Sequence, residues 1–196
     1  MGGLDSRLSI ALLVCLVAAL VYFAPRLEWA LILHPQTVWP LWPSCALLVS
    51  VLVLVPRKIW PILIPISFTS IVIFDLQKGV PIRSIAWFIA ADTIEVLIAA
   101  LCLSYFFDGV PAPNSVKAVA KYLLFAIILA PSAAAFLAAP GIGGDYWFGW
   151  RVSFFSDVLA FLTLAPAILS WVSGGRAWLR KSLAYQNQPN GFFGSV

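Results

Sequence analysis

The stretch SIAWFIAADTIEVLIAALCLSYFF, from Ser84 to Phe107, decides the fold class of this chain. It exceeds the roughly 20 apolar residues that carry a helix across a bilayer core, and only Asp92 and Glu95 in it are charged. Apolar residues make up 62% of the 196 residues and charged residues 10%, against about 25% charged in an ordinary soluble domain. A water-soluble fold of this size could not bury so much apolar surface. The sequence therefore predicts an integral membrane protein whose main partner is the lipid bilayer.

On either side of this stretch, prolines, glycines and basic residues separate further apolar runs. We expect six spans, at residues 8–24, 39–55, 59–74, 84–107, 116–139 and 151–172. Two loops are expected between them, a polar one at 75–83 and a glycine-rich one at 140–150. The predicted fold is all-α, a polytopic transmembrane helical bundle formed by residues 1–172. Residues 173–196 are expected to form a basic cytoplasmic tail without a heptad pattern.

The distribution of Lys and Arg predicts the orientation, because cytoplasmic loops are enriched in these residues. With the N-terminus in the cytoplasm, eight of the 12 basic residues fall on the cytoplasmic side: Arg7, Arg57, Lys58, Lys117, Lys121, Arg176, Arg180 and Lys181. The other four fall outside: Arg26, Lys78, Arg83 and Arg151. Both termini are therefore expected in the cytoplasm. Because the basic residues form no single cluster, no nucleic-acid partner is expected.

Three carboxyl groups interrupt the predicted spans, those of Asp92, Glu95 and Asp157. An ionised carboxylate near the bilayer centre costs about 2.5–3.5 kcal/mol on insertion scales, and such residues usually face the bundle interior. Asp92 and Glu95 are three residues apart and share a helix face. One interpretation is polar packing against hydroxyl groups. The candidate hydroxyl groups are those of Thr93, Ser67 and Thr69. The other interpretations are an outward-facing cavity for a ligand or cation, and a proton path.

No catalytic, metal or cofactor site is predicted. Two neighbouring carboxyl groups can serve acid–base chemistry, but the chain supplies no nucleophile–base pair beside them. The only histidine, His34, stands next to Pro35 in an expected outer loop and cannot form a multi-histidine metal site alone. Cys15, Cys45 and Cys102 lack CxxC spacing and are expected to pack as free thiols.

Trp-Pro pairs recur near the ends of the second and third predicted spans, at residues 39–40, 42–43 and 60–61. Indoles favour the membrane interface, and proline leaves a backbone carbonyl without its helical partner. We therefore expect irregular helix ends that pack against protein. The residues expected to shape the walls of a polar cavity are Trp42, Pro43, Trp60, Pro61 and Arg151.

Three stretches together resemble the MASE1 family of bacterial membrane-associated sensor domains. They are VWPLWPSCALLVSVLVLVPRKIWPILI from Val38 to Ile64, ADTIEVLIAALCLSYFF, and WRVSFFSDVLAFLTLAPAILSW. The matching positions are Trp42, Pro43, Arg57, Trp60, Pro61, Thr93, Glu95, Asp157 and Pro166. The chain departs from the family pattern at Asp92, where Asn is common, and at Ser156, where Gly is common.

The resemblance implies a sensor in a bacterial inner membrane that binds a small ligand. Asp92, Glu95 and Asp157 are the candidate ligand-binding residues. Members of the family are usually fused to histidine kinase, diguanylate cyclase or phosphodiesterase modules, and they commonly have about eight helices. This chain has six predicted spans and no output module. It is thus expected either to act through a cytoplasmic histidine kinase or diguanylate cyclase or to be a truncated gene product. A homo-oligomer is a separate expectation.

A second hypothesis is a six-span substrate-capture subunit of a vitamin-type transporter. Such subunits dock through patches of small residues, and the stretches at 133–135 and 99–100 are alanine-rich. The same alanines are equally suited to ordinary helix packing. Copurifying ATPase subunits would indicate the transporter, and copurifying signalling proteins would indicate the sensor.

Overall fold

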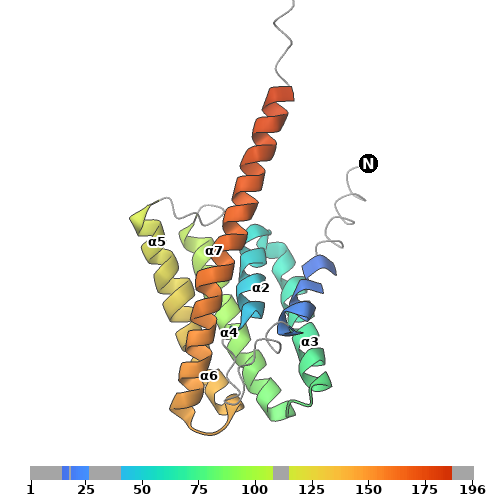
Figure 1. The fold of residues 1–196 in the computed structure, drawn as a ribbon, viewed down its shortest axis with the longest axis vertical. Coiled ribbons are helices and arrows are strands. Elements are labelled where there is room, and N and C mark those ends of the chain that lie inside the picture. Colours follow the sequence, from blue (N-terminus) through green and yellow to red (C-terminus); the bar gives the residue numbers. More distant parts are fainter. Residues whose placement is uncertain (1–14, 18, 27–40, 108–114, 187–196) are drawn as a thin grey trace, which may run out of the picture.

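The computed structural model describes residues 15–17, 19–26, 41–107 and 115–186, with side chains as far as Trp171. Every regular element among these residues is helical (Figure 1). This confirms the prediction of an all-α fold. The predicted Trp39-Pro40 pair and His34 lie outside the described residues.

Four helices are long and apolar enough to cross a membrane. They are Arg57–Gln77, Ile82–Phe106, Val116–Ile142 and Tyr146–Trp171. These four helices, together with their composition, indicate a membrane protein. The first two contain α3 (Trp60–Gln77, after a short 3-10 turn) and α4 (Ile82–Phe106). The third contains α5 (Val116–Tyr122), a π-helical segment (Leu123–Leu129) and α6 (Ala130–Ile142), and the fourth is the first part of α7 (Tyr146–Gln186).

Two of the six predicted spans are represented by shorter apolar helices, Cys15–Arg26 and α2 (Pro43–Leu54). The expected start of α2 at residue 39 is wrong for the described part, because residues 41 and 42 are not helical and Pro43 takes the first helical position. Proline fits that position because its missing N–H would lack a helical partner there anyway. With 12 residues, α2 is about 18 Å long and is too short to cross a core of about 30 Å alone.

The two predicted loops on the same side of the bundle are shorter than expected. The first is reduced to residues 78–81, because α3 continues through Asp75 to Gln77. The second is reduced to residues 143–145, because α6 continues through Pro140 and α7 begins at Tyr146. Both turns lie at one end of the molecule, which we call the hairpin end, at the bottom of Figure 1.

Local chemistry explains the tight turn between α6 and α7. Gly143 and Gly144 adopt φ values of 80° and 74°, a region that L side chains rarely occupy. The backbone N–H of Phe148 donates to Oδ1 of Asp145 at 2.7 Å, which caps the start of α7. These contacts reverse the chain within three residues.

α7 continues beyond residue 172, where the predicted sixth span ends. It is a single helix of 41 residues that passes through Gly174 and Gly175 and ends at Gln186. A glycine costs a helix only about 1 kcal/mol relative to alanine, so two glycines do not terminate a helix of this length. The C-terminal part of α7 projects beyond the other helices at the end opposite the hairpin end (Figure 1).

Small residues bring α4, α6 and α7 into close contact. Ala134 and Ala138 of α6 pack against Ala91 of α4 in a buried cluster. A Cβ atom at Gly141 would lie 2.8 Å from Cε1 of Phe88, and one at Gly149 would lie 3.0 Å from the carbonyl oxygen of Ala139. Helices in membranes commonly pack in this way, because small residues let backbones approach.

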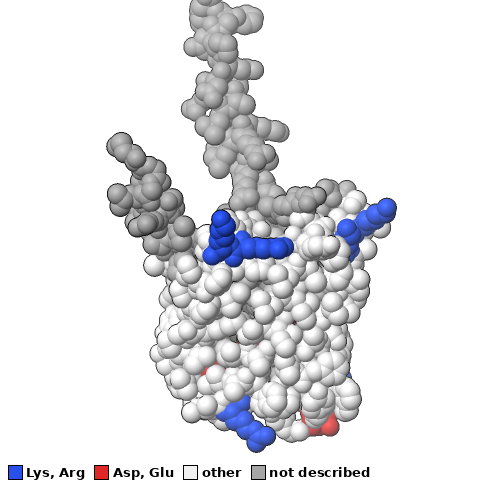
Figure 2. Space-filling model, turned by 180° about the vertical axis from the view of Figure 1, so that it is seen from behind, with Lys and Arg blue, Asp and Glu red and all other residues white. Residues whose placement is uncertain are grey.

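The outer surface of the bundle matches a lipid environment. Large apolar side chains such as those of Phe155, Leu162 and Ile128 are 62%, 45% and 52% exposed. In Figure 2, Lys and Arg lie at the two ends of the visible face, and the belt between them is almost entirely uncharged. Exposed apolar surface of this extent requires an apolar solvent or partner. Which end faces the cytoplasm stays a prediction.

Candidate functional site

Asp92, Glu95 and Asp157 are all buried, with exposed fractions of 8%, 1% and 7%. Asp92 lies ten residues after the start of α4, about 15 Å along that helix, and Asp157 lies eleven residues after the start of α7, about 16 Å along it. Both helices start at the hairpin end. The two aspartates therefore occupy nearly the same level, about halfway through the bundle.

The start of α2 lies at this level, inside the bundle. The Sγ atom of Cys45 and one carboxyl oxygen each of Asp92 and Glu95 all lie within 4.8 Å of one another. Trp42, the residue before α2, lines a cavity together with Asp92 and Asp157. A helix N-terminus carries a partial positive charge from its unpaired N–H groups, which favours nearby carboxylates. The shortness of α2 thus brings a helix end to three buried acids.

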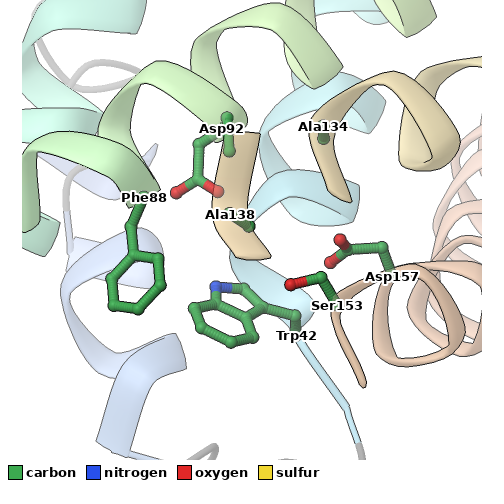
Figure 3. Close-up of a pocket in the computed structure, with 8 residues that line it drawn as sticks. Trp42, Phe88, Asp92, Ala134, Ala138, Ser153 and Asp157 are labelled. Atoms are coloured by element: carbon green, nitrogen blue, oxygen red, sulfur yellow. The ribbon is translucent and has the colours of Figure 1, made fainter. Parts of the chain in front are cut away.

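The cavity beside these acids is small and has polar groups on two sides. Its volume is ≈ 10 Å³, about the space that one water molecule needs. Figure 3 shows the Asp92 carboxyl group on the α4 side, with Ser153 and Asp157 of α7 on the opposite side. The lining residues are Trp42, Phe88, Ala91, Asp92, Ala134, Ala138, Ser153 and Asp157.

Two carboxyl oxygens of the site have no hydrogen-bond partner among the described residues. They are Oδ2 of Asp92 and Oε1 of Glu95. Buried polar atoms are hydrogen-bonded in the great majority of cases, and leaving one unpaired costs about 1–3 kcal/mol. Two such atoms in one cluster make these acids a candidate site for a ligand or an ion.

The hydroxyl groups considered as partners for these acids bond elsewhere or not at all. Thr93 donates to the carbonyl of Ile89 at 2.6 Å, and Thr69 donates to that of Pro65 at 2.7 Å. Each bond stays within its own helix. The Ser67 hydroxyl has no hydrogen-bond partner among the described residues. These three hydroxyls therefore do not provide the interhelical bonds that the polar-packing interpretation needs.

The residues expected to shape the cavity divide into two groups. Trp42 lines it, and Pro43, the first residue of α2, is buried beside it. Trp60, Pro61 and Arg151 are not among its lining residues. Trp60 donates from Nε1 to the carbonyl of Leu52 at 2.9 Å, which holds α3 against the end of α2. Arg151 is exposed and its Nε donates to the carbonyl of Trp147 at 3.1 Å.

Sequence reasoning missed Cys45 and Ser153 as members of the site. Ser153 precedes Asp157 by four residues and so shares its helix face, a spacing that could have indicated it. Cys45 carries no such signal, because it lies on a different helix from the acids it approaches.

Comparisons with known proteins do not assign the chain to a family. Searches of protein-family models, of curated proteins and of solved structures found no match.

Proposed function

We propose that this chain is a membrane-embedded signal-reception domain. A small ligand binds in the outward-facing polar site, and α7 carries the response to a cytoplasmic histidine kinase or cyclic-di-GMP module. One observation carries the proposal: Asp157 of the site lies on a helix that continues without a break to Gln186, beyond the rest of the bundle (Figure 1). A continuous helix links a displacement at the site to the far end of the molecule.

The site joins parts that can move against each other. Asp157 and Ser153 belong to α7, whereas Asp92 belongs to α4 and Trp42 precedes α2. A ligand that binds between them favours one packing of α7 over another, and it shifts the equilibrium by its difference in affinity for the two packings. Near the hairpin end α7 is held to α6 by the close contact of Gly149 with Ala139 and by the packing of Trp150 on Phe136, so a displacement of α7 has to arise on the far side of these contacts.

A bacterial inner membrane, with both termini in the cytoplasm, suits this function. In that orientation the hairpin end faces outwards and the end of α7 reaches the cytoplasm. The resemblance to MASE1 domains supports the same arrangement.

The transporter hypothesis receives less support. Its docking surface is expected at residues 133–135 and 99–100, yet Ala133 is half-buried and the other four alanines are 0–2% exposed. These four alanines pack inside the bundle, so they are not available to another subunit.

Hydrogen exchange of the full chain in lipid nanodiscs tests the proposal. The probe is Asp157→Asn, which removes one of the three carboxyl groups of the site and keeps the shape of the side chain. We expect a several-fold change in amide exchange at residues 172–186. Asp145→Asn serves as the matched control, because it removes one carboxyl group beside α7, keeps an oxygen that can accept the Phe148 N–H, and does not line the cavity. Unchanged exchange in Asp157→Asn would show that α7 does not relay the state of the site.

A further inference from the structure

The three-residue cluster Cys45, Asp92 and Glu95 has the composition of a metal site rather than of a packing contact. A thiol and two carboxyl groups, each at most 8% exposed, direct one donor atom each into a region no more than 4.8 Å across. We propose that this cluster binds one divalent transition-metal ion, with Zn²⁺ as the best match to its donors.

The distances suit coordination after small side-chain rotations. Zn–S bonds are about 2.3 Å long and Zn–O bonds about 2.0–2.2 Å, so two donors of one zinc ion lie less than about 4.5 Å apart. The three donors of the cluster already lie within 4.8 Å of one another. In tetrahedral coordination these bond lengths place the donors about 3.4–3.6 Å apart, so the widest pair must close by up to about 1.4 Å through side-chain rotation.

The second observation is the pair of buried, unpartnered oxygens. Oδ2 of Asp92 and Oε1 of Glu95 have no hydrogen-bond partner among the described residues, and their side chains are 92% and 99% buried. Buried charges in proteins are paired or coordinate metals. A cation at the cluster would supply a partner for these two oxygens.

The donor set selects among cations. A thiolate is a soft ligand that Mg²⁺ and Ca²⁺ avoid, and Ca²⁺ takes six to eight oxygen ligands. Zn²⁺ accepts both sulfur and carboxylate oxygen and is usually four-coordinate. A fourth ligand could be a water molecule, and the cavity that Asp92 also lines has room for about one.

The surroundings offer an approach to the site and partly balance its charge. Asp92 borders the cavity, and Asp157 on its far side adds a further carboxyl group to attract a cation. A thiolate and two carboxylates exceed the charge of a divalent ion by one, and the positive end of α2 beside them offsets part of this excess. Binding releases the thiol proton to solvent.

This inference rests on the proposed function for its biological meaning, because it names the class of ligand received. Binding itself is measured without reference to any output. Cobalt is the probe, since a thiolate-bound Co²⁺ ion shows a ligand-to-metal charge-transfer band that carboxylate-bound Co²⁺ lacks. We expect the full chain, purified with a chelator and placed in nanodiscs, to bind one Co²⁺ with this band, and Zn²⁺ to displace it.

Variants identify the sulfur ligand. Cys45→Ser is expected to abolish the band, whereas the double variant Cys15→Ser/Cys102→Ser, which keeps only Cys45, is expected to retain it. Cys15 and Cys102 are exposed and half-buried thiols outside the cluster. Loss of the band in the double variant would overturn the proposal, and this result holds even if Cys45→Ser fails to fold.

The carboxyl ligands are tested by affinity. Changes in outer-shell residues already cost about 10- to 100-fold in metal affinity. Glu95→Gln, which removes a direct ligand, is therefore expected to weaken Co²⁺ binding at least about 100-fold. Absence of the band in the wild type, or equal affinity in Glu95→Gln, would refute the metal site.

The two proposals fail separately. A thiolate–cobalt band without any effect of Co²⁺ on exchange at residues 172–186 supports the metal site and contradicts its role as the received signal. Altered exchange in Asp157→Asn without a cobalt band supports the relay and refutes the metal site.

Discussion

The Cys45 sulfur and a carboxyl oxygen of Asp92 lie within 4.8 Å of each other, although they belong to different helices. This proximity depends on the short length of α2, which begins at Pro43 inside the bundle. A full-length span would have carried its N-terminus to the membrane surface, far from the middle of α4. The irregular Trp-Pro entry thus positions the site.

The first prediction concerns the contact between α4 and α6. Gly141→Ala places a Cβ atom 2.8 Å from Cε1 of Phe88, which must shift. Overpacking of this kind typically costs about 1–3 kcal/mol. We expect a lower thermal unfolding midpoint in detergent. In a Phe88→Leu background the same substitution should cost less, because the two effects are coupled. Additive effects would contradict the contact.

The second prediction concerns the start of α7. Asp145→Ala removes the acceptor for the Phe148 N–H, a bond of 2.7 Å. Loss of such a cap costs about 0.5–2 kcal/mol. Asp145→Ser, which can still accept this bond, should recover most of the loss in unfolding measurements. Equal loss in both variants would assign the effect to something other than capping.

The third prediction concerns the contact between α7 and α5, which ends at Tyr122. The Tyr122 hydroxyl donates to the carbonyl of Phe161 at 2.6 Å. Tyr122→Phe deletes only that hydroxyl, and we expect a loss of about 0.5–1.5 kcal/mol. Tyr105→Phe is the matched control, because Tyr105 is 77% exposed and should have no measurable effect. A stability of Tyr122→Phe equal to that of the wild type would show that the bond contributes nothing.

Some features of the fold and of the site could be predicted from the sequence, and others could not. α4 was predictable because its apolar run is long and uninterrupted, and Asp92 was noticeable as a charge within it. The start of α2 was placed too early, because hydropathy does not reveal that residues 41 and 42 remain non-helical. The approach of Cys45 to the acids depends on how two helices pack. No local spacing encodes that packing, so no metal site was predicted.

The last prediction tests whether the buried acids serve to bind a metal ion or to pack the helices together. Glu95 is 1% exposed and its Oε1 has no hydrogen-bond partner among the described residues, so in the absence of metal it should reduce stability. Glu95→Met fills a similar volume without a polar atom, and replacing poorly paired buried polar groups by apolar ones is often neutral or stabilising.

We therefore expect Glu95→Met, in chelator, to unfold at a temperature equal to or above that of the wild type, and to lose Co²⁺ binding. Glu95→Gln is the control, because it keeps both the shape and the polarity. If Glu95 instead held the helices together through a buried polar partner, Glu95→Met would lower stability by about 1–3 kcal/mol, the cost of leaving that partner without a hydrogen bond. A loss of that size in the thermal unfolding of the metal-free chain would favour polar packing. A gain in stability with loss of metal binding would mark Glu95 as a residue retained for its ligand, because functional sites commonly carry such a cost in stability.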